Sequence, residues 1–109
     1  NRLLKLTVEC IRRQLRQTDL VARYGGDEFV VLLPETPASG AVGVADRIRR
    51  SMEQSPLTTR GGTVNATLSI GIAAYPTHGS DLESVLEKAD QAMYASKSGG
   101  KNRTTMFSA

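Results

Sequence analysis

The chain has 109 residues and a formal net charge of +3, and 39% of its residues are hydrophobic. This length suits one domain with its own core. The single cysteine excludes an internal disulfide and fits a reducing, cytoplasmic location. Tryptophan is absent and aromatic residues are few, which argues against a nucleic-acid platform that stacks bases. No apolar run is long enough to span a bilayer, so we expect no membrane contact, and the basic excess favours a phosphate-bearing small molecule as partner.

The first half of the chain predicts a helix, a hairpin and a second helix. Apolar residues at helical spacing over residues 3–16 predict the first helix. The segments TDLVARY and EFVVLLP are typical of two short strands, and the glycine pair between them has the composition of a tight hairpin turn. Thr36 followed by a proline predicts a capped helix start, and helical spacing then continues as far as Ser55.

The second half predicts a strand, a helix and a last strand. Apolar residues alternate with polar or small ones from Val64 to Ala74, which predicts one continuous strand. The segment SDLE, which begins at Ser80, has the form of a capping box, and it opens a helix that the glycine pair at Gly99 ends. NRTTMF predicts the final strand. The order αββαβαβ indicates one α+β domain over residues 1–109, with an antiparallel-rich central sheet and helices packed against it.

RYGGDEF is the most distinctive short stretch of the chain. Its two glycines allow the backbone to come close to a ligand. The adjacent carboxylates Asp27 and Glu28 are the ligands that Mg²⁺ takes when it shares its shell with substrate phosphates. Neighbouring side chains of a strand point to opposite faces, so both acids would bind one ion only if the turn distorts the backbone. A solvated turn without any ligand is the alternative that these residues alone leave open.

Three blocks of sequence together resemble the GGDEF family of diguanylate cyclases. They are RYGGDEFVVLLPET, LSIGIAAYP and ADQAMYASKSGGKNR, and their spacing matches over nearly the whole chain. The resemblance implies a fold similar to the palm of nucleotide cyclases and polymerases. It also implies an enzyme that condenses two GTP molecules into cyclic di-GMP with Mg²⁺, or Mn²⁺ in its place, and releases pyrophosphate. Since each domain of this kind holds one GTP, catalysis would need a homodimer.

The resemblance assigns roles to the residues of the signature turn. Asp27 matches the metal-binding acid of the family, and Glu28 matches an acid that is important to catalysis. Gly25 and Gly26 match the glycines that lie beside bound GTP. The expected site therefore combines two catalytic carboxylates, one of them a metal ligand, with a backbone that the substrate approaches closely.

Two lysines near the end of the last predicted helix complete the expected substrate site. Lys97 and Lys101 match basic positions that reach the triphosphate. The family often has Arg at the second position, and Lys there can neutralise phosphate but cannot form a bidentate fork. From the residues alone, both lysines are also consistent with a solvated helix end beside a glycine cap.

RQTD, which precedes the glycine pair, matches the RxxD inhibitory motif of the family at its usual spacing. The resemblance implies that Arg16 and Asp19 bind cyclic di-GMP. Arg suits forked contacts with phosphate and guanine edges, and Asp can accept hydrogen bonds from guanine amide protons. Arg47 matches the arginine that a neighbouring domain contributes to this site. The alternative for Arg16 and Asp19 is an exposed ion pair that closes a helix, worth under about 1 kcal/mol.

The resemblance also implies an active-site half that these 109 residues do not contain. The family's first strand with its metal-binding Asp, its phosphate-cradling turn and its guanine-binding residues precede the helix that begins near Asn1. We therefore expect a C-terminal portion of the domain that is inactive by itself. The parent chain is expected to be an active cyclase under product inhibition. The alternatives are a cyclic di-GMP receptor that no longer catalyses and a structural dimerisation module.

Overall fold

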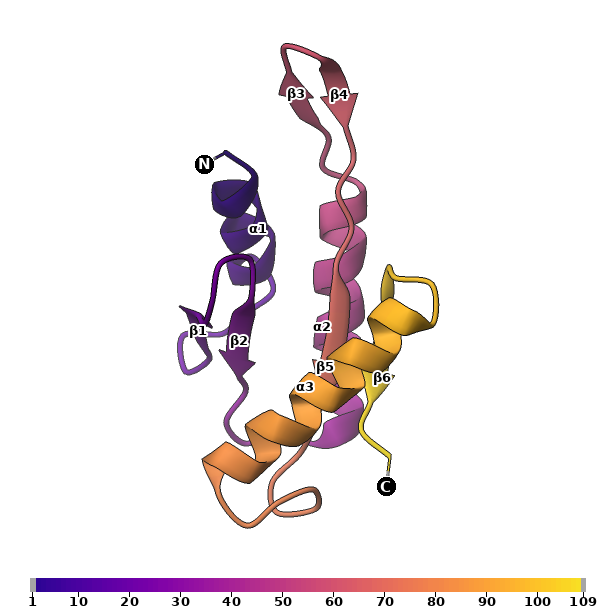
Figure 1. Cartoon of the computed structure of the whole chain (residues 1–109). Coiled ribbons are helices and arrows are strands. Elements are labelled where there is room, and N and C mark those ends of the chain that lie inside the picture. Colours follow the sequence, from indigo (N-terminus) through magenta and orange to yellow (C-terminus); the bar gives the residue numbers. More distant parts are fainter. Residues whose placement is uncertain (1, 109) are drawn as a thin grey trace.

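The computed structural model of the chain describes residues 2–108, which contain three helices and six strands (Figure 1). Asn1 and Ala109, which the expected domain bounds include, lie outside the described residues. The helices are α1 (Arg2–Arg12), α2 (Ala38–Glu53) and α3 (Leu82–Ser98). The strands are β1 (Leu20–Arg23), β2 (Phe29–Leu32), β3 (Leu57–Thr59), β4 (Gly62–Val64), β5 (Ser69–Ile72) and β6 (Arg103–Met106). Within residues 2–108, no helix combines the length and the apolar character that a membrane crossing requires.

The six strands form three separate pairs. β1 and β2 form an antiparallel hairpin in which Val21 lies opposite Val31, and β3 and β4 form a second antiparallel hairpin. β5 and β6 are parallel, as strands joined by a helical crossover can be. The prediction of an α+β fold rich in antiparallel pairing is confirmed, but the strands of residues 2–108 do not join into one central sheet.

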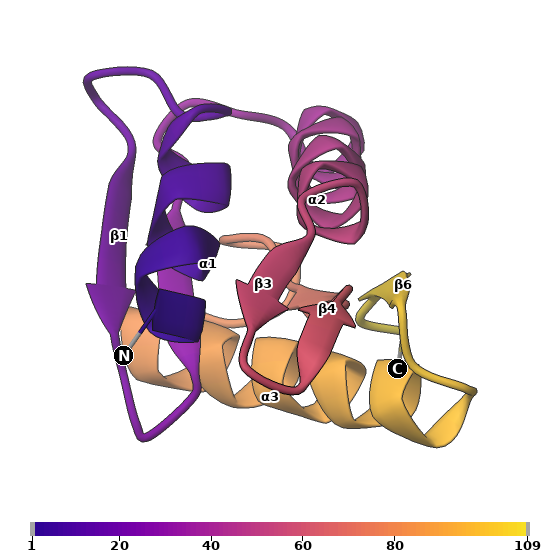
Figure 2. The ribbon, with the colours of Figure 1, turned by 90° about the horizontal axis from the view of Figure 1, so that it is seen from above.

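Helix α3 lies across the strands and packs against both β5 and β6 (Figure 2). A Cβ atom at Gly71 would stand 2.1 Å from the Met93 nitrogen and 2.2 Å from the Ala89 carbonyl oxygen. Only glycine therefore lets the helix backbone rest directly on β5. The buried Ser96 hydroxyl donates to the Ile70 carbonyl at 2.8 Å and ties the same two elements together.

The core lies around α2, which packs against α1, β5 and β6, and continues where α3 packs against β5. Its buried apolar side chains come from every helix and from that strand: Cys10, Ile11, Ala45, Ile48, Met52, Ile72 and Ala92. Met52 of α2 is 1% exposed and Cys10 of α1 is fully buried. Burying a side chain of the size of Met or Ile contributes roughly 1.5–3 kcal/mol. Helix α2 is therefore the element that joins α1 to the rest of the core.

The first two helices begin or end at different residues from those predicted. Helix α1 ends at Arg12, before residue 16, and α2 begins after Pro37, which is an N-cap without a side-chain hydrogen bond. Thr36, the predicted cap, lies one residue before the N-cap, and its hydroxyl accepts from the Arg16 guanidinium at 2.8 Å instead. A contact with a residue distant in sequence thus replaces the local cap.

The capping box of α3 lies one residue further along the chain than SDLE predicts. Asp81, rather than Ser80, is the N-cap, and its carboxylate accepts from the Ser84 backbone nitrogen at 2.8 Å. The Ser84 hydroxyl reaches back to the Asp81 nitrogen at 3.3 Å, which completes the box. Hydrogen bonds from Ser84 lower the pKa of Asp81. The predicted end of this helix at Gly99 is confirmed.

The prediction of one continuous strand from Val64 to Ala74 is wrong. Strand β4 ends at Val64, the next four residues are not in a strand, and β5 covers only Ser69–Ile72. Apolar alternation reports which side of a segment is buried but does not report its pairing partner. Here β4 pairs with β3 and β5 pairs with β6, so the observed order is αββαβββαβ.

Candidate active site

The signature turn, residues 24–28, connects β1 to β2 and is held by its own backbone and by one arginine. The Tyr24 nitrogen donates to the Glu28 carbonyl at 2.8 Å. The Arg23 guanidinium donates to the Gly25 carbonyl at 3.0 Å and to the Gly26 carbonyl at 2.7 Å. Sequence reasoning assigned no role to Arg23, although an arginine beside two exposed glycine carbonyls is a recognisable signal. The predicted hairpin is confirmed, but the connection between its strands has five residues, 24–28, and is not the tight turn that the glycine pair predicts.

The two glycines of this turn are not required by the fold of residues 2–108. Neither has a positive φ angle. A Cβ atom at Gly26 would meet no heavy atom within 4 Å, and one at Gly25 would meet only the Glu28 Cβ, at 3.9 Å. Glycine is needed where the backbone is left-handed or where another group comes close. Since residues 2–108 supply neither reason, the space beside the turn is open to a group from outside them.

The two carboxylates of the turn are exposed and carry no partner among the described residues. Asp27 and Glu28 lie between the strands rather than in one, so the expectation that strand geometry separates them does not apply. No hydrogen bond or ion pair within residues 2–108 uses either carboxylate. Within the same residues, no group of three acidic, histidine or cysteine side chains could hold a metal ion. These two acids could bind an ion whose remaining ligands come from a substrate or water.

The lysines lie at the other end of the molecule from this turn. Lys97 is in the last turn of α3, and Lys101 follows the helix with a φ of 64°. Both side chains are exposed. Figures 1 and 2 both separate the loop after α3 from the turn between β1 and β2, and no ion pair joins these lysines to Asp27 or Glu28. The structure therefore presents the expected substrate-binding groups in two places rather than in one cluster.

Arg16 and Asp19 are brought together as the RxxD spacing predicts. The Arg16 nitrogen donates to Asp19 Oδ2 at 2.8 Å, and the guanidinium lies 3.6 Å from Oδ1. The Asp19 side chain is only 3% exposed, and its Oδ1 atom has no hydrogen bond among the described residues. Arg16 is 60% exposed and also donates to the Pro34 carbonyl at 3.0 Å. A buried carboxylate oxygen that is ion-paired but accepts no hydrogen bond within residues 2–108 is a candidate acceptor for a ligand.

A pocket of about 350 Å³ adjoins this pair. It is lined from the end of α1 to the start of β1, and Arg12, Arg16 and Asp19 contribute its polar groups together with Gln17. Arg47 of α2 donates to Gln14 at 3.3 Å, beside the same end of α1. The three residues expected at the inhibitory site therefore come from the region where α1 ends and α2 passes it, and Arg47 forms no bond with the other two within the described residues.

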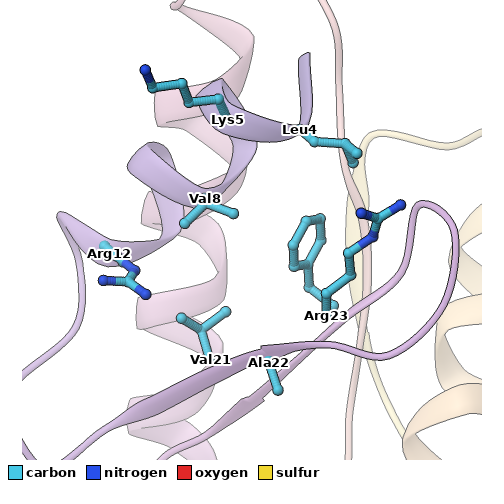
Figure 3. A pocket seen from close by; sticks show the side chains of 8 residues that line it. Leu4, Lys5, Val8, Arg12, Val21, Ala22 and Arg23 are labelled. Carbon is cyan, nitrogen blue, oxygen red and sulfur yellow. The ribbon is translucent and has the colours of Figure 1, made fainter. Parts of the chain in front are cut away.

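A second pocket, of about 250 Å³, lies between α1 and the β1–β2 hairpin (Figure 3). Leu4 and Val8 of α1 face Val21 of β1 across it, and Arg12 and Arg23 stand at its sides. None of the carboxylates or lysines expected in the active site lines this pocket. The pocket is thus a gap in the packing of α1 on the hairpin, separate from the groups that carry chemistry.

Comparisons with known proteins agree with the fold and the signature turn. The family described as "Diguanylate cyclase, GGDEF domain" matches residues 1–103. Diguanylate cyclase A of Treponema denticola is 42% identical to this chain over 103 residues. That alignment covers 94% of this chain and 28% of the relative, so the chain spans less than a third of the length of that protein.

Two solved structures have the same arrangement of elements. A structure comprising only the GGDEF domain of TpbB from Pseudomonas aeruginosa has a TM-score of 0.89 and 42% identity, and the match covers 97% of this chain and 62% of that one. The GGDEF domain of DgcB from Caulobacter crescentus, solved in complex with c-di-GMP, has a TM-score of 0.78 and 27% identity. This match covers 99% of the present chain and 64% of the DgcB chain.

Proposed function

Because the chain belongs to the diguanylate cyclase GGDEF domain family, we propose that the protein carrying it condenses two GTP molecules into cyclic di-GMP. The observation that carries this proposal is the turn between β1 and β2. Two glycines stand there without a conformational or packing reason, next to two exposed carboxylates without partners in residues 2–108. A turn built only for folding needs neither feature, whereas a turn that admits a nucleotide to its backbone needs both.

Asp27 and Glu28 fit a Mg²⁺ ion, or Mn²⁺ in its place. Mg²⁺ is bound through one or two carboxylates and keeps its other positions for water and substrate phosphates, which suits an exposed acidic pair. In the proposed site Asp27 is the metal ligand and Glu28 is the second catalytic acid. When bound, the ion offsets negative charge on the phosphates and on the attacking oxygen.

The remaining groups hold the nucleotide. Gly25 and Gly26 leave room for GTP beside the turn, and Lys97 and Lys101 neutralise its triphosphate. Because the turn and the lysines are separated in space, they hold different parts of the bound nucleotide. Lys101 acts as a point charge, since an ammonium group cannot form the bidentate fork of a guanidinium.

The reaction requires two copies of the domain. In each of two steps a 3′ oxygen of one GTP forms a bond to the α-phosphorus of the other. The bond from that phosphorus to the β-phosphate bridge breaks, and pyrophosphate leaves while the hydroxyl proton is released. Each domain holds one nucleotide, so a homodimer supplies the proximity on which much of the acceleration depends.

Product inhibition is the second part of the proposed function. Arg16 and Asp19 form the site for cyclic di-GMP, and Arg47 of a neighbouring domain joins them. This part is supported by the pocket of about 350 Å³, by the buried Asp19 oxygen without a donor, and by the c-di-GMP complex of the related DgcB domain. Guanine amide protons are suitable donors to Asp19, and phosphate suits the exposed Arg16 guanidinium.

Asp27→Asn in the protein that carries this domain tests the catalytic assignment. We expect turnover of GTP to fall roughly a hundredfold or more because the metal ligand loses its charge. The Tm should stay close to that of the unmodified protein, since the carboxylate is exposed and unpartnered within residues 2–108. Asp90→Asn, at an exposed position on α3, is the matched control. Unchanged turnover in Asp27→Asn would remove Asp27 from the site.

A receptor without catalysis is the competing function, and one observation favours it. The Arg16–Asp19 pair that carries the proposed product site lies within residues 2–108 and lines a pocket of about 350 Å³. Calorimetry with cyclic di-GMP and turnover of GTP on one preparation separate the two. Product binding without turnover supports the receptor, and both activities together support the cyclase.

A further inference from the structure

The loop after α3 has a backbone that its helix cap does not require. Gly100, Lys101 and Asn102 have φ angles of 119°, 64° and 45°. A helix commonly ends with one left-handed residue, usually glycine. Here two further residues with side chains continue in the same region, and a lysine is rarely found there. Such a backbone persists only where surrounding contacts enforce it, and it tends to occur at functional sites.

The contacts that enforce it come from α2. The Asn102 side-chain oxygen accepts from Arg49 Nη1 at 3.2 Å, and its side-chain nitrogen donates to the Glu53 carboxylate. Both ends of one half-buried amide are thus bound to α2, about fifty residues earlier in the chain. Arg49 is itself restrained, because its Nε lies 3.6 Å from Asp46 Oδ1. Asparagine also tolerates a positive φ better than other residues with side chains.

The backbone of Lys101 is held on both sides. Its nitrogen donates to the Ser96 carbonyl at 3.0 Å, and its own carbonyl accepts from Arg103 Nε at 3.3 Å. Gly100 cannot be replaced freely, since its φ of 119° is a conformation that residues with side chains rarely adopt. Meanwhile the Lys101 side chain is exposed. The loop therefore fixes the direction in which one ammonium group leaves the protein surface.

We propose that Asn102, bound by Arg49 and Glu53, is a positioning residue for the triphosphate of the substrate. Its amide locks the loop to α2 and so aims Lys101 at the phosphates. The inference deepens the proposed function, because it depends on Lys101 contacting a triphosphate. If the loop moved freely, ordering it on binding would cost conformational entropy. That cost would offset part of the favourable binding energy between the single ammonium group and the polyphosphate.

The test is Asn102→Gly in the protein that carries this domain. Glycine keeps the positive φ available and removes only the amide, so strain is not added. We expect the KM for GTP to rise about tenfold while kcat changes little, because a contact made in both the ground state and the transition state is weakened. Glu53→Ala should act in the same way, and Glu53→Gln, which keeps an oxygen acceptor for Asn102, should restore the KM.

Asn65→Gly is the matched control. The Asn65 side-chain amide donates to the backbone carbonyl of Glu53 at 3.0 Å, but Asn65 lies outside the loop after α3. The decrease in Tm should be no larger in Asn65→Gly than in Asn102→Gly, and the KM for GTP should equal that of the unmodified protein. If Asn102→Gly lowers Tm and leaves the KM unchanged, the amide only stabilises the fold and the proposal is overturned.

Binding of inorganic tripolyphosphate, followed through the NMR shift of the Lys101 amide, makes the test independent of turnover. We expect saturation in the unmodified protein and about tenfold weaker binding in Asn102→Gly. If the protein makes no cyclic di-GMP but this weakening is seen, the positioning role stands and the cyclase assignment fails. If the unmodified protein does not bind tripolyphosphate, or if Asn102→Gly binds it equally well, the positioning role fails.

Discussion

Gly26→Ala separates folding from function more cleanly than any other substitution in the signature turn. A methyl group at this position meets no heavy atom within 4 Å, and Gly26 has no positive φ, so alanine fits the native backbone. Alanine has fewer unfolded conformations than glycine, so we expect the free energy of unfolding to rise by about 0.4–1 kcal/mol. For a domain of this size the corresponding rise in Tm is roughly 2–8 °C.

Turnover should change in the opposite direction. The open space beside Gly26 is where the proposed site receives the nucleotide, and an added methyl group occupies part of it. We expect turnover of GTP to fall at least about tenfold, which corresponds to about 1.4 kcal/mol of lost transition-state stabilisation. A variant that is more stable and less active would show that glycine is present for the substrate rather than for the turn.

Gly71→Ala is the matched control, because there the glycine is required for packing. Its Cβ would stand 2.1 Å from the Met93 nitrogen and 2.2 Å from the Ala89 oxygen, both of them backbone atoms of α3 that cannot rotate away. Overpacking typically costs about 1–3 kcal/mol, and contacts with backbone place this case at the upper end. We therefore expect a Tm lower by roughly 10 °C or more.

Thermal melts followed by circular dichroism and GTP turnover on the same preparations measure both quantities. A lower Tm in Gly26→Ala would mean that the turn needs glycine for its own backbone. Turnover equal to that of the unmodified protein would mean that nothing approaches Gly26 during the reaction. Either result refutes the interpretation of this turn as a nucleotide site.

Three further outcomes are expected. Arg16→Ala should relieve inhibition by cyclic di-GMP and leave initial rates nearly unchanged, which progress curves with added product measure; undiminished product binding by calorimetry would contradict it. The lowered pKa of Asp81 means that its cap stabilises the fold above pH 3.8 and that this contribution is lost as the pH falls through the folded-state pKa. Asp81→Asn keeps an oxygen acceptor for the cap but has no carboxyl group to titrate. Below pH 3.8 this variant should therefore lose less stability than the unmodified protein does, and an equal loss in acid titrations would contradict the prediction. The 109-residue chain by itself should make no cyclic di-GMP, because the resemblance implies a second metal-binding Asp that these residues do not contain. It should also self-associate, because within residues 2–108 β2 and β5 each pair with one strand and leave one edge open. A monomer in sedimentation, or measurable turnover, would argue against this.

Local sequence determined the elements whose causes are local. The helix that ends at Gly99, the last strand and the hairpin around the glycine pair all follow from periodicity and from glycine chemistry, and the structure confirms each of them. The spacing of Arg16 and Asp19 likewise predicts their pairing, since residues three apart in a turn can reach each other. Neighbouring residues alone impose these features, so no knowledge of the rest of the fold is needed.

Tertiary structure decided the features that depend on a distant partner. Alternation continued from Val64 to Ala74, but the strand is divided because its two parts pair with different strands. Thr36 has the chemistry of a helix cap and instead binds Arg16, twenty residues away.

The loop that carries Lys101 is the clearest case. The sequence there predicts a glycine cap and a solvated lysine. Only the folded chain brings α2 alongside, so that Arg49 and Glu53 bind the amide of Asn102, the last of three successive residues at positive φ. Sequence periodicity reports the burial of a segment's own faces, whereas a strained backbone is set by whichever element the fold places beside it.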